Sequence, residues 1–134
     1  MSVERDLGRL LAGLTPVMTE GVYVFATLAP GGAVPAGLSP RMRFEEAEGT
    51  TLILGREEAA RAGLDAVFES RMITLSVHSS LEAVGFMAAI ATRLAAAGIS
   101  VNPVAGFHHD HLFVPADRAE EAMAILHDLS KSPG

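Results

Sequence analysis

In some segments of the chain the apolar residues recur at helical spacing, and in others they form short continuous runs typical of strands. This pattern predicts most of the helices and strands. Helical spacing predicts helices at residues 3–13, 80–97 and 119–126, and a shorter helix that opens with the run at 56–60. Runs rich in β-branched and aromatic residues predict strands at residues 22–28, 72–77, 99–104 and 111–114, and a hairpin over residues 44–54. Three prolines and three glycines at residues 30–40 predict an irregular loop. The chain therefore mixes strands and helices, as in the α/β and α+β classes.

The order of the expected elements repeats within the chain. A strand followed by a helix at Leu52–Ala59 is echoed by a similar pair at Leu112–Ala122. In the second half the full order is β-α-β-β-α, the split arrangement called ferredoxin-like. We therefore expect two degenerate copies of one unit, at residues 1–70 and 71–130, followed by a short tail at 131–134.

The helix expected at residues 80–97 is apolar on nearly all sides. A helix of this kind cannot pack on one sheet and leave its other face in water, because the exposed surface would promote association. Small residues on one face would let a second helix approach closely. These residues are Gly85, Ala88, Ala89, Thr92 and Ala96. We expect a second packing partner for this helix, and hence a homodimer.

Composition and charge narrow the classes of partner. The chain has 134 residues, of which 49% are hydrophobic and 19% charged, so it can bury a core. Its formal net charge of −6 makes nucleic acid and anionic membrane surfaces unfavourable partners. The chain contains no cysteine, which excludes disulfides, thiolate metal sites and cysteine nucleophiles. No apolar run reaches membrane-spanning length and the first residues are acidic, so we expect a cytoplasmic protein.

Several segments of the second half carry a resemblance to a known family. An acidic residue followed by a glycine opens the long helix at Glu82–Gly85, and the pair Gly98-Ile99 begins the next strand. Together with Val77–Gly85, Asn102–Gly106 and His109–Pro115, this pattern resembles the ACT family, and in particular its small bacterial members with two modules. A more distant similarity is to the animal cytosolic arginine sensors, which also contain tandem ACT modules. The resemblance extends over residues 23–126.

The resemblance implies two tandem ferredoxin-like ACT modules with antiparallel sheets. It also implies dimerisation, and binding of amino acids or other small effectors near the first strand-to-helix loop of a module. It implies no catalysis. The phenylalanine and methionine residues lie at strand or helix spacing typical of a core, so we expect no cofactor. In the second half, Val84 stands where proline often precedes the glycine in this family. The first half has no recognisable loop motif, so the resemblance supplies no ligand site in the first half. We expect a regulatory or sensor protein whose output partner is another molecule.

The residues expected to bind the ligand lie in the loop before the long helix and in the following hairpin. They are His78, Ser79, Ser80, Leu81, Glu82, Val84, Gly85, Asn102 and Asp110. Free amides at the start of the helix would receive a ligand carboxylate, and Asp110 would pair with an ammonium or guanidinium group. Each also has a purely structural interpretation: Ser79 and Glu82 fit a capping box, whereas Asp110 and Asn102 fit turn residues.

A histidine and aspartate cluster at residues 108–111 supports an alternative, a small enzyme or a metal-binding protein. His109 and His111 share one face of a strand, but a third metal ligand would have to come from elsewhere, so we expect no metal. Ser79 and Ser80 lack the Gly-x-Ser-x-Gly elbow that presents a nucleophilic serine. The binding-protein interpretation is therefore favoured over an enzyme.

Overall fold

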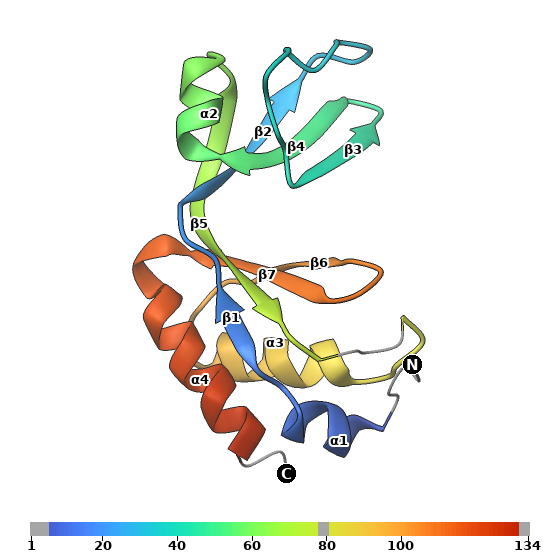
Figure 1. Ribbon diagram of the computed structural model, residues 1–134, viewed down its shortest axis with the longest axis vertical. Helices are drawn as coiled ribbons and strands as arrows, with labels where there is room; N and C mark the ends of the chain where they lie inside the picture. Colours follow the sequence, from blue (N-terminus) through green and yellow to red (C-terminus); the bar gives the residue numbers. More distant parts are fainter. Residues whose placement is uncertain (1–5, 78–80, 132–134) are drawn as a thin grey trace. The chain divides into compact units, whose positions relative to one another are not determined.

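The computed structural model describes residues 6–77 and 81–131, which form two compact units (Figure 1). Unit 2 is the continuous segment Gly21–Ser70, whereas unit 1 combines Met1–Glu20 with Arg71–Gly134. The fold is α+β with antiparallel sheets, which confirms the class predicted from the sequence. Among the described helices, none is long and apolar enough to cross a membrane.

Unit 2 is a four-stranded antiparallel sheet with one short helix. Its elements are β2 (Tyr23–Leu28), β3 (Met42–Glu46), β4 (Gly49–Gly55), α2 (Arg56–Arg61) and the first part of β5 (Asp65–Leu75). The strand order is β3-β4-β2-β5, and α2 contacts β2 and β4. Val24, Ala26, Leu52, Leu54 and Ala59 form its core. The segment between β2 and β3 contains neither helix nor strand, as its prolines and glycines predict.

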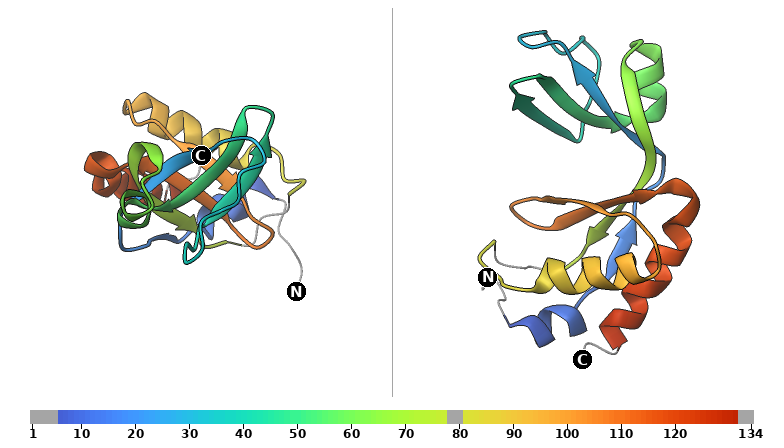
Figure 2. Two further views of the ribbon diagram at one scale, coloured as in Figure 1. Left: turned by 90° about the horizontal axis from the view of Figure 1, so that it is seen from above. Right: turned by 180° about the vertical axis from the view of Figure 1, so that it is seen from behind.

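Unit 1 contains the remaining elements and the larger core. These are α1 (Leu7–Ala12), β1 (Pro16–Met18), the rest of β5, α3 (Phe86–Ala96), β6 (Asn102–Ala105), β7 (Asp110–Pro115), a 3-10 turn (Ala116–Arg118) and α4 (Ala119–Lys131). The strand order is β1-β5-β7-β6. The three helices contact one another, and α4 also contacts β1 and β7 (Figures 1 and 2).

Strand β1 completes the ferredoxin-like arrangement of unit 1. The described residues from Arg71 onward supply three strands, and the fourth comes from the beginning of the chain. Pro16 lies opposite Leu75, and Met18 lies opposite Ile73 in an antiparallel pair. Because β1 has only three residues and begins with proline, its sequence carries no clear strand pattern.

The first residues of the chain therefore belong with its second half. Leu10, Leu11 and Leu14 are buried in the same core as Phe86 and Ile90. The compact units thus differ from the expected division at residue 70, which groups residues 1–20 with residues 21–70. The second packing partner expected for the long helix is provided within the chain, because α1 and α4 both contact α3.

Two elements have bounds that differ from those expected. Strand β5 begins at Asp65 rather than at residue 72. Within the part that was not predicted, Phe68 has a positive φ of 65° and the pairing with β2 shifts register. This irregularity breaks the alternation by which a strand is recognised. Helix α3 begins at Phe86 rather than at residue 80, because Gly85 has the left-handed φ of 89° that interrupts a helix.

Candidate functional site

The residues expected at the start of α3 occupy a turn that precedes the helix. His78, Ser79 and Ser80 lie outside the described residues, so the predicted capping box and the serine contacts cannot be placed. Leu81 and Val84 are exposed, at 70% and 85% of their surface, and Glu82 is exposed as well. Gly85 is the N-cap residue and offers no side chain to the first amides of α3. The N-cap residue therefore provides no side-chain acceptor for the hydrogen bonds of these amides.

Asp110 and Asn102 lie at opposite ends of the β6–β7 hairpin. Asp110 is half-buried and pairs with Ala105 beside the turn, whereas Asn102 is exposed and pairs with Phe113. Three residues of strand separate the two pairs, which corresponds to about 10 Å. The ribbon views place the β6–β7 turn at the same end of unit 1 as the turn before α3 (Figures 1 and 2). The structure thus brings Asp110, but not Asn102, to the end where residues 81–85 lie.

The histidines of the hairpin take part in contacts within the fold. His111 Nδ1 and the Thr74 hydroxyl lie 2.9 Å apart, in a hydrogen bond between β7 and β5. The rings of His108 and Phe107 meet edge to face, with centroids 5.0 Å apart. Within residues 6–77 and 81–131, no three histidine or acidic side chains gather in a way that would hold a metal ion. His111 therefore has a hydrogen-bonding role within the sheet.

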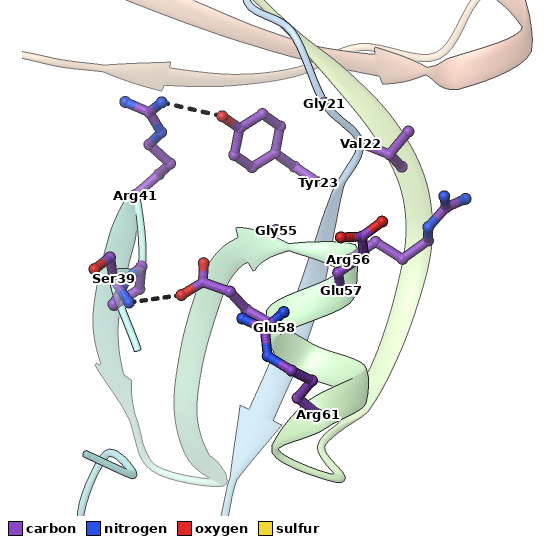
Figure 3. A pocket seen from close by; sticks show the side chains of 11 residues that line it. Gly21, Val22, Tyr23, Ser39, Arg41, Gly55, Arg56, Glu57, Glu58 and Arg61 are labelled. Carbon is purple, nitrogen blue, oxygen red and sulfur yellow. Dashed lines mark hydrogen bonds between the residues drawn. The ribbon is translucent and has the colours of Figure 1, made fainter. Parts of the chain in front are cut away.

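A pocket in unit 2 brings together charged side chains that no sequence motif indicates. Its volume is 750 Å³, and Figure 3 shows the side chains around it. Three segments line it: the start of β2 at 21–23, the segment before β3 at 39–41, and the junction of β4 with α2 at 55–58 together with Arg61. The pocket therefore combines residues that are up to 40 positions apart, from Gly21 to Arg61.

Hydrogen bonds fix the walls of this pocket. The backbone amide of Ser39 donates to Glu58 Oε2 at 2.9 Å, which ties the loop to α2. The amide of Arg56 donates to the Val22 carbonyl at 2.9 Å, which ties α2 to the start of β2. Arg41 Nη2 donates to the Tyr23 hydroxyl at 3.0 Å, and its guanidinium lies 5.5 Å from the centre of the Tyr23 ring.

Sequence reasoning missed this pocket because its chemistry depends on strand pairing. Tyr23 lies opposite Gly55 in the β2–β4 pair, which places the start of one strand beside the end of the other. The visible signals were only the Ser39-Pro40-Arg41 segment after a flexible loop and the two glutamates that open α2. Neither signal by itself indicates a binding site.

Two family models, both described as ACT domain, match the chain at residues 2–71 and 67–128. No curated protein matches the chain. Together the two matches extend over residues 2–128.

Several solved structures are similar to the chain. A protein of unknown function from Vibrio cholerae, described as a possible transport protein, is 44% identical, with 92% of this chain and 95% of that chain covered and a TM-score of 0.84. A protein from Agrobacterium tumefaciens is 16% identical, covers 87% and 89%, and has a TM-score of 0.75. The ligand-free regulatory subunit of aspartate kinase from Thermus thermophilus is 11% identical, covers 84% and 94%, and has a TM-score of 0.63. The last two likenesses concern the fold alone.

Proposed function

The chain belongs to the ACT domain family, and on this premise we propose that it is a regulatory protein that binds an amino acid and catalyses no reaction. ACT domains typically bind amino acids in regulation, and two such domains match in succession. The observation that carries the proposal is the placement of the turn before α3 and the Asp110 turn at one end of unit 1 (Figures 1 and 2).

The chemistry of these two turns suits a zwitterion. A bound amino acid needs donors for its carboxylate and an acceptor for its ammonium, because burying either charge without a partner costs several kcal/mol. The first amides of α3 are donors that the Gly85 N-cap leaves without a side-chain cap. Asp110 provides a carboxylate for the ammonium group. In this proposal Leu81, Glu82 and Val84 form the rim of the site, joined by His78, Ser79 and Ser80 of the same loop.

The absence of catalysis is part of the proposal. The Nδ1 atom of His111 is hydrogen-bonded to Thr74, so one of its two ring nitrogens is used within the fold. A cytoplasmic location is also proposed, and cell fractionation would check it.

Thermal shift followed by calorimetry tests the proposal. A screen of the proteinogenic amino acids should identify one that raises the melting temperature, because a ligand that binds only the folded state stabilises it. For that ligand, Asp110→Asn should weaken binding by about tenfold or more, since a charge-assisted contact is lost. Asp117→Asn is the matched control, because Asp117 is an exposed aspartate in the 3-10 turn after β7. If no amino acid shifts the melting temperature, or if both variants bind like the parent, the proposal is rejected.

A further inference from the structure

The pocket of unit 2 has the features of a ligand site in its own right. We propose that it binds a small organic carboxylate, which Arg41 and Arg61 hold from two of its walls (Figure 3). This inference goes beyond the proposed function, because it concerns other residues and a ligand that needs no ammonium group.

The pocket is formed before any ligand arrives. The Arg41 amide donates to the Ile53 carbonyl at 2.6 Å, and Ser39 and Arg56 are fixed by the bonds described above. Tyr23 is only 8% exposed, so its ring forms a firm base beneath the Arg41 guanidinium. Walls that are already ordered reduce the entropy lost on binding. The volume of 750 Å³ lies within the range of small-molecule sites, about 300 to 1,000 Å³.

Two of the three arginines in the walls have unused donors. Arg56 forms an ion pair with Glu69 at 3.2 Å, and in Figure 3 its guanidinium points away from the pocket. Arg41 donates to the Tyr23 hydroxyl, and it forms no ion pair with a carboxylate among the described residues. The Arg61 side chain likewise forms no hydrogen bond or ion pair within the described part of the chain. Because a guanidinium has five N–H donors arranged as a fork that fits a carboxylate, these two side chains indicate a carboxylate ligand.

The glutamates of the pocket favour a carboxylate over a phosphate. Glu57 and Glu58 both line the cavity, and the Glu58 carboxylate is engaged with the Ser39 amide. A phosphate at neutral pH concentrates up to two negative charges on one group, whereas a dicarboxylate carries one on each carboxylate, so each of its groups is repelled less strongly by these side chains. In this proposal the arginines attract an anionic ligand, and the glutamates disfavour a ligand that carries two negative charges on the same group.

Calorimetry with glutarate tests the inference separately from the proposed function. Glutarate has carboxylates but no ammonium, so it lacks the group that Asp110 would receive in unit 1. We expect one glutarate per chain, with binding weakened by about tenfold or more in Arg41→Gln and in Arg61→Gln, because each loses a charge-assisted contact. Arg43→Gln is the matched control, since Arg43 lies two residues along, is exposed, and forms an ion pair with Glu45 outside the pocket.

Each result of this experiment bears on the inference. Arg41→Gln should fold, because the backbone amide rather than the side chain of Arg41 bonds to Ile53; an unchanged melting temperature verifies this. Asp110→Asn should bind glutarate like the parent. The inference is overturned if the parent binds no glutarate at millimolar concentration, if Arg41→Gln and Arg61→Gln bind it normally, or if inorganic phosphate binds as tightly as glutarate. Loss of glutarate binding in Asp110→Asn alone would assign the ligand to unit 1 and leave the proposed function standing.

Discussion

Gly49 shows how one residue can be fixed by the backbone around it. It opens β4 with a φ of 156°, and a Cβ atom added there would overlap the carbonyl oxygen of Leu28. Gly63 also has a positive φ, of 65°, but a Cβ atom there would meet no atom within 4 Å. A substitution at Gly63 would therefore introduce backbone strain alone, whereas a substitution at Gly49 would add a steric overlap.

We expect Gly49→Ala to destabilise the protein by about 3 kcal/mol or more, because the β2–β4 pair has to shift. Gly63→Ala should cost only the strain of a left-handed residue, about 1 to 2 kcal/mol. Urea denaturation of both variants measures the difference. Equal losses would mean that the overlap at Gly49 is relieved without cost.

Glu45 has a lowered pKa, which provides a prediction about pH. The hydrogen bond from Arg43 Nε, 2.7 Å long, is the main cause of the lower pKa, and the bond from the Thr50 hydroxyl adds to it. Because the pKa is lower in the folded protein, the stabilisation is present above the ordinary value of 4.5 and is lost as the pH falls through the lowered pKa.

Arg43→Gln should therefore raise the pKa of Glu45 toward its ordinary value, as measured by NMR titration of the side-chain carboxyl groups. Arg118→Gln is the control, because the Arg118 hydrogen bond lowers the pKa of Glu121 instead. That variant should move the pKa of Glu121 and leave that of Glu45 unchanged. A Glu45 pKa that stays low in Arg43→Gln would contradict the assignment.

At the scale of single residues, the sequence was least informative about the pocket of unit 2. Asp110 was predicted to bind the ligand from its family motif, whereas Arg41 and Tyr23 belong to no motif and meet only through the pairing of β2 with β4. The same pairing gives Arg61 its place in the pocket wall, through the helix that follows β4. Local patterns cannot report such non-local contacts.

At the scale of elements, apolar periodicity predicted most of the fold. The hairpin of β3 and β4, and helices α1 and α4, lie where the pattern of apolar residues places them. β1 was missed because three residues beginning with proline show no alternation, and the first half of β5 because a residue with positive φ interrupts it. Strand β1 is held by its pairing with residues 73–75 of β5, and the first half of β5 is held by its pairing with β2.

Helix α1 is short, so its stability depends on packing. Six residues form too few hydrogen bonds to be stable alone, and Leu10 and Leu11 are buried in the core of unit 1. Leu10→Ala should destabilise the protein by about 2 to 5 kcal/mol, whereas Leu7→Ala, at a position 38% exposed on the same helix, should cost less than about 1 kcal/mol. Chemical denaturation compares the two variants. Similar losses would mean that α1 is not held by its buried face.

At the scale of the whole molecule, we propose that the protein is a homodimer. Although α1 and α4 pack on α3, its Ala88, Thr92, Ala95 and Ala96 remain exposed. Small exposed residues on a helix allow close approach of a second helix.

Thr92→Glu should convert the dimer to a folded monomer, because a charge would be placed in the contact. Ala124→Glu, at an exposed position on α4, is the matched control and should remain dimeric. Sedimentation velocity at micromolar concentration measures both variants. A monomeric parent protein would rule out the dimer, and a dimeric Thr92→Glu would place the contact elsewhere.

The interrupted course of unit 1 has a consequence for synthesis on the ribosome. Unit 2 is one continuous segment, so all of its residues have been made once Ser70 is added. The segment carrying α1 and β1 is made before unit 2, yet its partners are Leu75 in β5, Phe86 in α3 and Leu126 in α4. Its full set of contacts can form only after α4 has been translated, because contacts so distant in sequence form late. Unit 2 is therefore free to fold before the core of unit 1 is complete.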